Sequence, residues 1–433
     1  MILKKIETRL AHTGVIGLGY VGLPLMMTIA KAGFFVTGVD ISHQKVERFQ
    51  QGISDVSDVA SADLASFIQR GQIQVTTDYR VLTKLDTVNI CVPTPLRKSK
   101  DPDMSFIISA VEGIVQYLHK DQLIILESTT YPGTTEEVVL PRLAESGLEI
   151  GKDFFLAFSP ERIDPGNEIY ETANTPKIVG GITPECTQIA KLFYEQFINK
   201  VHVVSSTQAA EMVKLLENTF RSVNIGLVNE MALMCDRMGM DVWEIVDAAA
   251  TKPFGFMPFY PGPGLGGHCI PIDPHYLSWK AKTYEFYARF IELASEINGS
   301  MPKYVFDKIT GALNRHRTAV NGSKVLIVGV AYKKDVGDTR ESPAIDVIRM
   351  IVAEGGEILY HDPYVPQLQI DGVESYTSQE LTIDIVKSVD CVAIMTDHTN
   401  IDYEWLVKHA VVVVDARNAT KSVEAHRDKI IKI

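Results

Sequence analysis

The chain has 433 residues, of which 46% are hydrophobic and 22% charged, the balance of a globular protein with two or three domains. Its net charge of −12 argues against nucleic-acid or anionic-membrane binding as the main task, although a single site can still be locally basic. Five scattered cysteines do not make a disulfide framework, and no apolar run has the length of a signal peptide or a membrane span. These features predict a cytoplasmic enzyme or binding protein.

The first 205 residues alternate short apolar strands with helical stretches. The run HTGVIGLGYVGLPLMMTIAKAGFFVTGVD predicts a strand, a glycine turn, a helix and a second strand. Later apolar segments end in turn or polar residues: DTVNICVPTP, LIILESTTYPG, DFFLAFSPER, KIVGG and KVHVVSS. This pattern is typical of an α/β domain with a mostly parallel, doubly wound, Rossmann-like sheet over residues 1–205.

The glycine turn has the spacing of a dinucleotide-binding site. Gly17 permits a tight turn, Gly19 lets backbone amides approach a pyrophosphate, and Gly22 lets the helix pack close to the sheet. Asp40 follows the next strand, where its carboxylate can accept bonds from both ribose hydroxyls and would repel a 2′-phosphate. The turn therefore predicts NAD rather than NADP; the alternative is a structural turn with a solvated aspartate.

The middle of the chain, residues 206–318, is predicted to be helical. TQAAEMVKLLENTFRSVNIGLVNEMALMCDRMG has no proline and reads as one long helix, and MDVWEIVDAAAT as another. A glycine- and proline-rich loop follows, and then more helix, in which NGSMP predicts a junction between two helices. We expect this region to link the flanking domains or to form a dimer.

A second doubly wound α/β domain is predicted for residues 319–433. Its strands are KVLIVGVAY, EILYHDP, VDCVAIMTDH and AVVVVDARN, and it shows no sequence repeat of the first domain. The loop after the first strand carries Lys333, Lys334 and Arg340 in place of the glycine pattern. Because ligands bind beyond the carboxyl ends of such strands, this loop suits a second, phosphate-bearing ligand; the alternative is an ordinary charged surface loop.

Cys269 lies in the glycine- and proline-rich loop, in GGHCIPIDPHY, and three interpretations compete. It can be a buried structural cysteine. It can belong to a metal site with His268, Asp273 and His275, although no second cysteine is near. It can be a nucleophile, since glycines allow close approach of a substrate and a helix starting just after the thiol would favour the thiolate. Asp273, four residues on, can then act on a proton or a water.

Further polar residues stand where chemistry is expected. Lys214 and Asn218 share one face of the long helix, one turn apart, and can donate to a developing oxyanion; the alternative is a solvent-facing pair. Glu161 follows one strand of the first sheet, and Ser128 and Thr129 follow another. A nicotinamide cofactor beside a nucleophilic cysteine indicates oxidation through a thiohemiacetal and a thioester to a carboxylate, on a phosphorylated or nucleotide-linked substrate.

These motifs together resemble the UDP-glucose/GDP-mannose dehydrogenase family, the nucleotide-sugar 6-dehydrogenases. The segments that carry the resemblance occur in family order: GVIGLGYVGLPL, VPTP, ESTTYPGTT, FSPERIDPGN, EMVKLLENTFRSVNI, GPGLGGHCIPIDP and GVAYKKDVGDTRESPA. It implies a four-electron oxidation of the C6 alcohol of a UDP-hexose with two NAD, an N-terminal NAD-binding and a C-terminal UDP-sugar-binding domain, and a homodimer or higher oligomer built on the long helix.

The resemblance also implies roles for individual residues, with Cys269 as nucleophile and Asp273 as base. The implied catalytic residues are Cys269, Asp273, Lys214, Asn218, Thr129 and Glu161. The implied cofactor-binding residues are Gly17, Gly19, Tyr20, Val21, Gly22, Asp40, Lys45, Thr94, Thr129 and Arg340. The implied substrate-binding residues are Glu161, Lys214, Asn218, Lys252, Tyr260, Gly266 and Lys333, and no metal is implied.

Two positions depart from the UDP-glucose enzymes of the family. Pro165 stands where a second glutamate is common, and Ile272 where a lysine often precedes the aspartate. The chain is closer to the branch acting on UDP-N-acetylglucosamine, with UDP-N-acetylmannosamine and UDP-glucose as alternatives, in surface polysaccharide synthesis such as that of capsule or O-antigen. Two other functions stay open: a two-electron hydroxyacid-type dehydrogenase and a non-catalytic nucleotide-sugar sensor.

Overall fold

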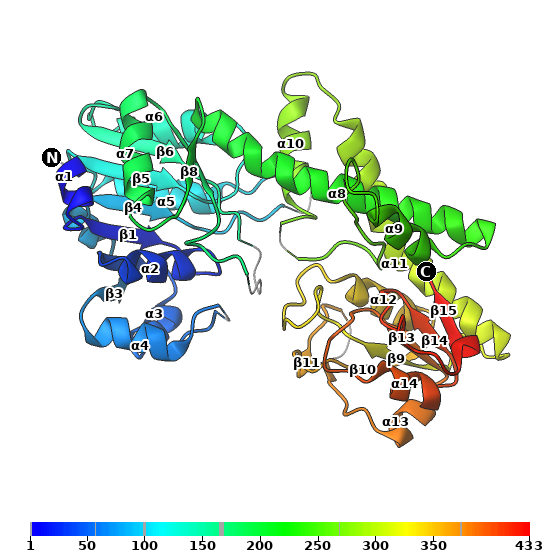
Figure 1. Ribbon diagram of the computed structural model, residues 1–433. Helices are drawn as coiled ribbons and strands as arrows, with labels where there is room; N and C mark the ends of the chain where they lie inside the picture. The colour runs from blue at the N-terminus through cyan, green and yellow to red at the C-terminus, as the bar shows by residue number, and fades with distance from the viewer. Residues whose placement is uncertain (1, 57, 98–100, 164–168, 268, 373–374) are drawn as a thin grey trace. The chain divides into compact units, whose positions relative to one another are not determined.

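The computed structural model describes every residue of the chain except 1, 57, 98–100, 164–168, 268 and 373–374. The chain forms two compact units (Figure 1). The first comprises Met1–Glu217 and His275–Phe286, and the second Asn218–Pro274 and Tyr287–Ile433.

The first unit is built on an eight-stranded sheet in the order β3-β2-β1-β4-β5-β6-β7-β8. All neighbouring strands are parallel except β6 and β7. The strands are β1 His12–Ile16, β2 Phe35–Val39, β3 Ile73–Thr76, β4 Thr87–Ile90, β5 Gln122–Leu126, β6 Phe154–Phe158, β7 Lys177–Gly181 and β8 Val201–Val203. The order reverses between β1 and β4, which is where ligands bind in open sheets of this kind.

Helices cover both faces of this sheet, so the central strands β4, β5 and β6 are buried at every position. On one face the apolar core joins residues of α1, α2, α3, α4 and α7, and on the other it joins residues of α5, α6 and the 3₁₀ turn η1. The bounds are α1 Ile2–Glu7, α2 Gly22–Lys31, α3 His43–Gln50, α4 Ser61–Gln69, η1 Tyr79–Lys84, α5 Ser105–Val115, the π-helical turn η2 Thr135–Val139, α6 Leu140–Ala144 and α7 Pro184–Tyr194.

The predicted long helix is present as α8, Thr207–Met238, and α9 spans Val242–Ala250. The helix expected just after Cys269 is α10, Asp273–Lys282. The predicted junction at NGSMP is wrong, because α11 runs unbroken over Arg289–Arg315 with Pro302 inside it. Proline removes one helical hydrogen bond, and the buried side chain of Asn298 anchors this turn instead, donating to the Ser222 carbonyl and accepting from Asn229.

The second unit is built on a five-stranded parallel sheet in the order β10-β9-β13-β14-β15. Residues of α9, α11 and α12 form the apolar core on one face, and residues of α14 and α13 form the core on the other (Figure 1). The bounds are β9 Lys324–Val328, α12 Pro343–Ala353, β10 Glu357–His361, β11 Gln367–Leu368, β12 Tyr376–Thr377, α13 Ile383–Lys387, β13 Cys391–Ile394, α14 Tyr403–His409, β14 Val413–Asp415, the 3₁₀ turn η3 Arg427–Lys429 and β15 Ile430–Lys432. Among the described residues, no helix combines the length and apolarity that crossing a bilayer requires.

Candidate active site

The glycine turn after β1 has the geometry that its sequence predicts. Gly17 has a φ of 89°, a left-handed conformation that side chains disfavour, and its amide donates to the Val39 carbonyl. A Cβ on Gly22 would lie 1.8 Å from the Gly17 carbonyl oxygen, so no other residue fits at the start of α2. Val21 occupies the N-cap position of this helix without a side-chain hydrogen bond, and Tyr20 beside it is half exposed.

Asp40 lies at the carboxyl end of β2 and is held against the glycine turn. Its carboxylate accepts hydrogen bonds from the amides of Leu18 and Ser42, both at 2.9 Å. The ammonium of Lys45 lies 3.7 Å from one carboxylate oxygen, so two residues expected to bind the cofactor lie side by side. The carboxylate is 8% exposed and retains acceptor capacity for a further donor.

A dinucleotide fits this turn. A Cβ added at Gly19 would meet no atom of the described protein within 4 Å, so the fold itself does not require glycine there. A glycine that the protein does not need, at the N-terminus of a helix and beside a carboxylate, is the arrangement that backbone approach to a pyrophosphate requires. Gly17, Gly19, Gly22 and Asp40 would hold NAD here.

Thr94 and α10 meet at the same edge of the first sheet. Thr94 follows β4 and is 6% exposed, and its carbonyl accepts a 2.8 Å hydrogen bond from the hydroxyl of Tyr276 in α10. Trp279 packs against Tyr131 with ring centroids 5.0 Å apart, and Lys280 pairs with Glu137 at 2.7 Å. The part of α10 in the first unit is thus fixed at the carboxyl edge of the strands, seven residues after Cys269 in the chain.

The segment after β5 contains a residue that sequence reasoning missed. Thr129, which was predicted, is half-buried, and Ser128 donates to the Val92 carbonyl at 2.8 Å. Thr130 is 1% exposed, and its hydroxyl has no hydrogen-bond partner among the described residues. A buried unpaired hydroxyl is uncommon and marks a candidate site residue.

Glu211 of α8 fixes the end of the same segment. One carboxylate oxygen accepts from the Gly133 amide at 2.6 Å, and the other accepts from the amide and hydroxyl of Thr135. Burial raises the pKa of Glu211 to about 7 against these donors. The contact ties the loop that carries Thr129 and Thr130 to the helix that carries Lys214.

Glu161 belongs to a buried network of alternating charges. The Lys177 ammonium, 3% exposed, lies 2.8 Å from Glu161 and 2.6 Å from Glu127. The second Glu161 oxygen accepts from the amides of Arg162 and Ile163. Burial alone would raise the pKa of Glu161, but Lys177 outweighs it and holds that pKa below its usual value.

The charge of Lys214 also lowers the pKa of Glu161, which places these two predicted residues together in the first unit. Glu127 in turn accepts hydrogen bonds from Asn89 and Tyr194. The prediction missed Lys177 and Glu127. The available signal was a lysine opening the otherwise apolar strand KIVGG, since a buried lysine requires carboxylate partners.

In the second unit, Asn218 and Asp273 come together although 55 residues separate them. The Asn218 amide donates to the Asp273 carboxylate at 2.6 Å, and the carboxylate is 2% exposed. The Asp273 amide donates to the Cys269 carbonyl at 2.8 Å, which fixes the cysteine one turn before α10, where it is exposed. Lys214, one helical turn before Asn218, shares its face of α8.

The glycines before Cys269 allow a close approach within the protein. A Cβ on Gly266 would lie 2.5 Å from the Tyr332 Cβ, and Gly267, with a φ of 82°, donates to the Arg340 carbonyl. The loop that leads to the thiol therefore packs against the cationic loop after β9. Packing within the protein thus requires glycine at these two positions, in addition to the substrate approach predicted from the sequence.

Lys252 and Tyr260 lie near α9. The ammonium of Lys252 stands 5.0 Å from the ring centre of Phe254. Tyr260 donates to Asp247 at 2.7 Å and stacks on Trp243 with an interplanar angle of 13°. The contacts of both residues are local to this part of the second unit.

The carboxyl edge of the second sheet carries several cations. Lys333 is half-buried in the loop 329–342, and the exposed guanidinium of Arg340 bonds to Asp338. Arg417 follows β14, donates to the Met395 carbonyl, and was missed by the prediction; burial lowers its pKa. The sequence feature that could have marked it is an arginine directly after the apolar run AVVVVDA, where a strand end is expected.

The metal interpretation of Cys269 gains no support. Among the described residues, no group of three or more potential ligand side chains gathers. His268, one of the candidate ligands, lies outside the described residues.

Of the two positions that depart from the UDP-glucose enzymes, Pro165 also lies outside the described residues. Ile272 donates its amide to the Cys269 carbonyl at 3.1 Å.

Comparison with known proteins identifies the family of the chain. Three models of the UDP-glucose/GDP-mannose dehydrogenase family match it in order: the NAD binding domain over 11–198, the central domain over 208–300 and the UDP binding domain over 326–422. The chain is 36% identical to the UDP-N-acetyl-D-glucosamine 6-dehydrogenase of Pseudomonas aeruginosa, over 81% of this chain and 82% of that one. It is 34% identical to the UDP-N-acetyl-D-mannosamine dehydrogenase of Pyrococcus horikoshii, over 94% and 95%.

A solved structure described as UDP-D-ManNAc dehydrogenase from Pyrococcus horikoshii superposes with a TM-score of 0.87 at 31% identity, covering 97% of this chain and 98% of that one. The match therefore spans both sheets and the helical segment between them. The glycine turn with Asp40 fits the first family model, and the cationic loop lies within the third. The chain belongs to the UDP-glucose/GDP-mannose dehydrogenase family and is an NAD-dependent UDP-sugar dehydrogenase.

Proposed function

We propose that the protein oxidises the C6 alcohol of UDP-N-acetylglucosamine to the corresponding uronic acid in two steps. The relative from Pseudomonas aeruginosa is named for this sugar, and relatives at similar identity are named for UDP-N-acetylmannosamine, so the mannosamine epimer is the second candidate. The hydrogen bond between Asn218 and Asp273, beside the backbone of Cys269, is the observation that carries the proposal.

Residues of this chain supply the proton and acyl chemistry, and NAD, when bound, accepts a hydride in each oxidation. The first oxidation converts the alcohol to an aldehyde and releases the hydroxyl proton. The Cys269 sulfur then bonds to C6, giving a thiohemiacetal, and the second oxidation gives a thioester. Water adds to the thioester, the C–S bond breaks, and the carboxylate and the thiol are released.

Asp273 is the proposed base for the hydroxyl proton and for the water. Its buried carboxylate is oriented by Asn218 and lies one turn from Cys269 in the chain. Lys214 and Asn218 are the proposed donors to the oxyanion that forms at C6. Glu161 is held ionised by Lys177, which favours a role in orienting water and Lys214 over donation of a proton.

Substrate and cofactor contacts outside this cluster are also proposals. The Lys333 loop and Arg417 would bind the diphosphate of UDP, and Lys252, Tyr260 and Gly266 the sugar side. Arg340 would reach the cofactor.

We propose a homodimer through α8. Its exposed apolar side chains recur at helical spacing along one face: Met212, Leu216, Phe220, Leu227, Met234 and Met238. Replacing Leu216, which is 62% exposed, by glutamate should turn a dimer into a monomer in sedimentation velocity. A wild-type monomer would refute this assembly.

The function is tested with NAD and a panel of UDP-sugars, following NADH absorbance and quantifying the uronic acid. The proposal requires two NADH for each uronate and a higher kcat/KM for the N-acetylglucosamine substrate than for its epimer. Cys269→Ser should abolish turnover and leave the affinity for NAD unchanged. One NADH per product would instead indicate a two-electron dehydrogenase, and binding without NADH a sensor.

A further inference from the structure

The loop 329–342 joins β9 to α12 and carries Lys333 and Lys334, so its conformation decides where two ammonium groups stand. Lys334 is exposed, and Lys333 is half-buried. Long lysine side chains bind phosphate effectively only where the backbone beneath them is fixed, because ordering a mobile loop subtracts from the affinity. Asp335, the next residue, fixes the part of the loop that directly follows the two lysines.

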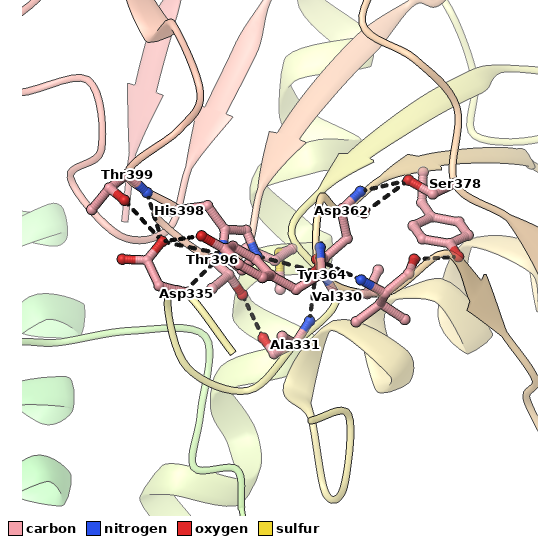
Figure 2. A network of polar contacts seen from close by, with 12 residues as sticks. Val330, Ala331, Asp335, Asp362, Tyr364, Ser378, Thr396, His398 and Thr399 are labelled. Atoms are coloured by element: carbon pink, nitrogen blue, oxygen red, sulfur yellow. Dashed lines mark hydrogen bonds and ion pairs between the residues drawn. The ribbon is translucent and has the colours of Figure 1, made fainter. Parts of the chain in front are cut away.

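Asp335 has a φ of 60°, a left-handed conformation that is uncommon for a residue other than glycine. One carboxylate oxygen accepts from the amide of Thr399 at 2.9 Å and from its hydroxyl at 3.0 Å. The amide of Asp335 donates to Nδ1 of His398 at 3.0 Å. These contacts hold the unfavourable backbone conformation directly after the two lysines (Figure 2).

His398 is fully buried, and its partners determine which ring nitrogen carries the proton. A backbone amide can only donate, so Nδ1 must accept from Asp335 and the proton lies on Nε2. Nε2 lies 3.1 Å from a carboxylate oxygen of Asp362, to which it donates. The imidazole thus connects the lysine loop to the end of β10.

The Asp362 carboxylate is itself held in place by hydrogen bonds to both of its oxygens, so it fixes the position of the imidazole. The oxygen that faces His398 also accepts from the amides of Val330 and Ala331, and the other oxygen accepts from the amides of Tyr364 and Val365. The first two amides are the ones that would face a phosphate after β9. Because Asp362 occupies them, the positive charge for a phosphate at this edge must come from side chains.

We propose that His398 is a positioning residue for the nucleotide diphosphate: through the Asp335 amide it fixes the Lys333–Lys334 loop on the Asp362 carboxylate. The inference rests on the proposed function, in that the ligand of this loop is the diphosphate of UDP. The affinity for UDP should depend more on the Nδ1 acceptor than on the Nε2 donor, since Nδ1 is the ring nitrogen that bonds to the loop.

Two substitutions separate the two ring nitrogens. In His398→Asn the side-chain oxygen can occupy the place of Nδ1 and accept from Asp335, and the contact with Asp362 is lost. In His398→Gln the amide can reach Asp362, and the acceptor for Asp335 is lost. UDP binding to the full-length protein is measured by calorimetry, together with NAD binding, kcat and KM for the UDP-sugar. His409→Gln, on α14 of the same unit, is the matched control.

His398→Gln should weaken UDP binding about tenfold, the value of one hydrogen bond, and raise KM similarly with kcat and NAD affinity unchanged. His398→Asn and His409→Gln should keep the UDP dissociation constant within about threefold of wild type. Unchanged UDP affinity in His398→Gln, or a greater loss in His398→Asn, overturns the inference. Wild-type protein that binds no UDP overturns the proposed function itself.

Thr399→Val provides a second test that leaves the buried imidazole untouched. Thr399 is exposed, and valine removes only the hydroxyl that donates to Asp335. We expect UDP binding to weaken about threefold, with thermal stability and NAD affinity unchanged. An unchanged UDP dissociation constant in this variant overturns the inference even if His398→Gln does not fold.

Discussion

The two parallel sheets share a backbone frame that their sequences do not reveal. In the first, Gly17 follows β1 in a left-handed conformation and donates to the carbonyl that ends β2; in the second, Gly329 follows β9 with a φ of 83° and donates to the carbonyl that ends β10. Asp40 and Asp362 are the next residues after β2 and β10, and each accepts the amide two residues after the first strand, Leu18 or Val330. The two sheets therefore share one arrangement of strand ends, glycine and aspartate, although the residues around it differ.

The difference lies in how completely the two carboxylates are used. Asp40 accepts from two amides and keeps acceptor capacity, as a residue that receives ribose hydroxyls requires. Asp362 accepts from four amides and His398, and is 2% exposed. The first frame leaves Asp40 with acceptor capacity for a further donor. In the second frame, contacts within the protein use the acceptor capacity of Asp362, and the longer loop that follows carries lysines.

The largest expected effect comes from neutralising the two carboxylates. Asp362→Asn places an amide against donors and should cost the second unit about 3–5 kcal/mol, because a buried charge network loses its acceptor. Asp40→Asn should cost about 1 kcal/mol of stability and mainly weaken NAD binding. Denaturant unfolding measures the loss of stability in both variants, and NAD titration measures the loss of cofactor affinity. Equal losses of stability in the two variants would contradict the proposed difference between Asp40 and Asp362.

The two units should also respond to pH in opposite directions. The pKa of Glu211 is raised by burial from 4.5 to about 7, so its contribution is fully present below pH 4.5 and is lost as the pH rises through about 7. That loss in the first unit is at most about 3 kcal/mol. Burial would raise the pKa of Asp362, but His398 and backbone amides hold that pKa below its usual 3.8. The contribution of Asp362 to the stability of the second unit is therefore fully present above pH 3.8 and is lost as the pH falls further.

Hydrogen exchange resolved by segment would measure the response of the first unit between pH 5 and pH 8, and that of the second unit between pH 5 and a pH below 3.8. Glu211→Gln is the control, since it cannot titrate and should remove the pH slope of the first unit while leaving the second unit unaffected. A slope that persists in Glu211→Gln would assign the response to another group.

Gly22→Ala tests the first frame alone. The added methyl would overlap the Gly17 carbonyl oxygen, so the start of α2 must move away from the turn. NAD affinity should fall at least about 50-fold, while UDP affinity should remain that of the wild type. Calorimetry with both ligands distinguishes this from general unfolding. An unchanged affinity for NAD would mean that the turn does not hold the cofactor.

The smallest expected effect on stability is that of Thr130→Val. The hydroxyl is buried and has no partner among the described residues, so replacing it by a methyl should change the free energy of unfolding by less than about 1 kcal/mol. If the hydroxyl serves the reaction, kcat should nevertheless fall at least about tenfold. A stable variant with full activity would show that Thr130 has no part in the site.

The sequence predicted the parts of this protein that depend on local patterns. The turn at Gly17 to Gly22, the strands flanking it and the long helix α8 follow from spacing and composition. The prediction at NGSMP was wrong because local rules treat Pro302 as a helix breaker. Asn298 makes contacts with Ser222 and Asn229 that are distant in sequence, and these hold the helix continuous.

The candidate site divides in the same way. The sequence by itself determined the glycine turn, the carboxylate after β2, and a cysteine followed one turn later by an aspartate, because each is a short-range spacing. The tertiary structure alone decided that Lys177 links Glu127 to Glu161, that Asn218 meets Asp273, and that Asp362 and His398 fix the lysine loop. Such contacts join strand ends and helices far apart in the chain. A buried charge is stable only beside a group of opposite charge or a hydrogen-bond partner. Which residue becomes that partner depends on the three-dimensional packing, and no local sequence pattern predicts it.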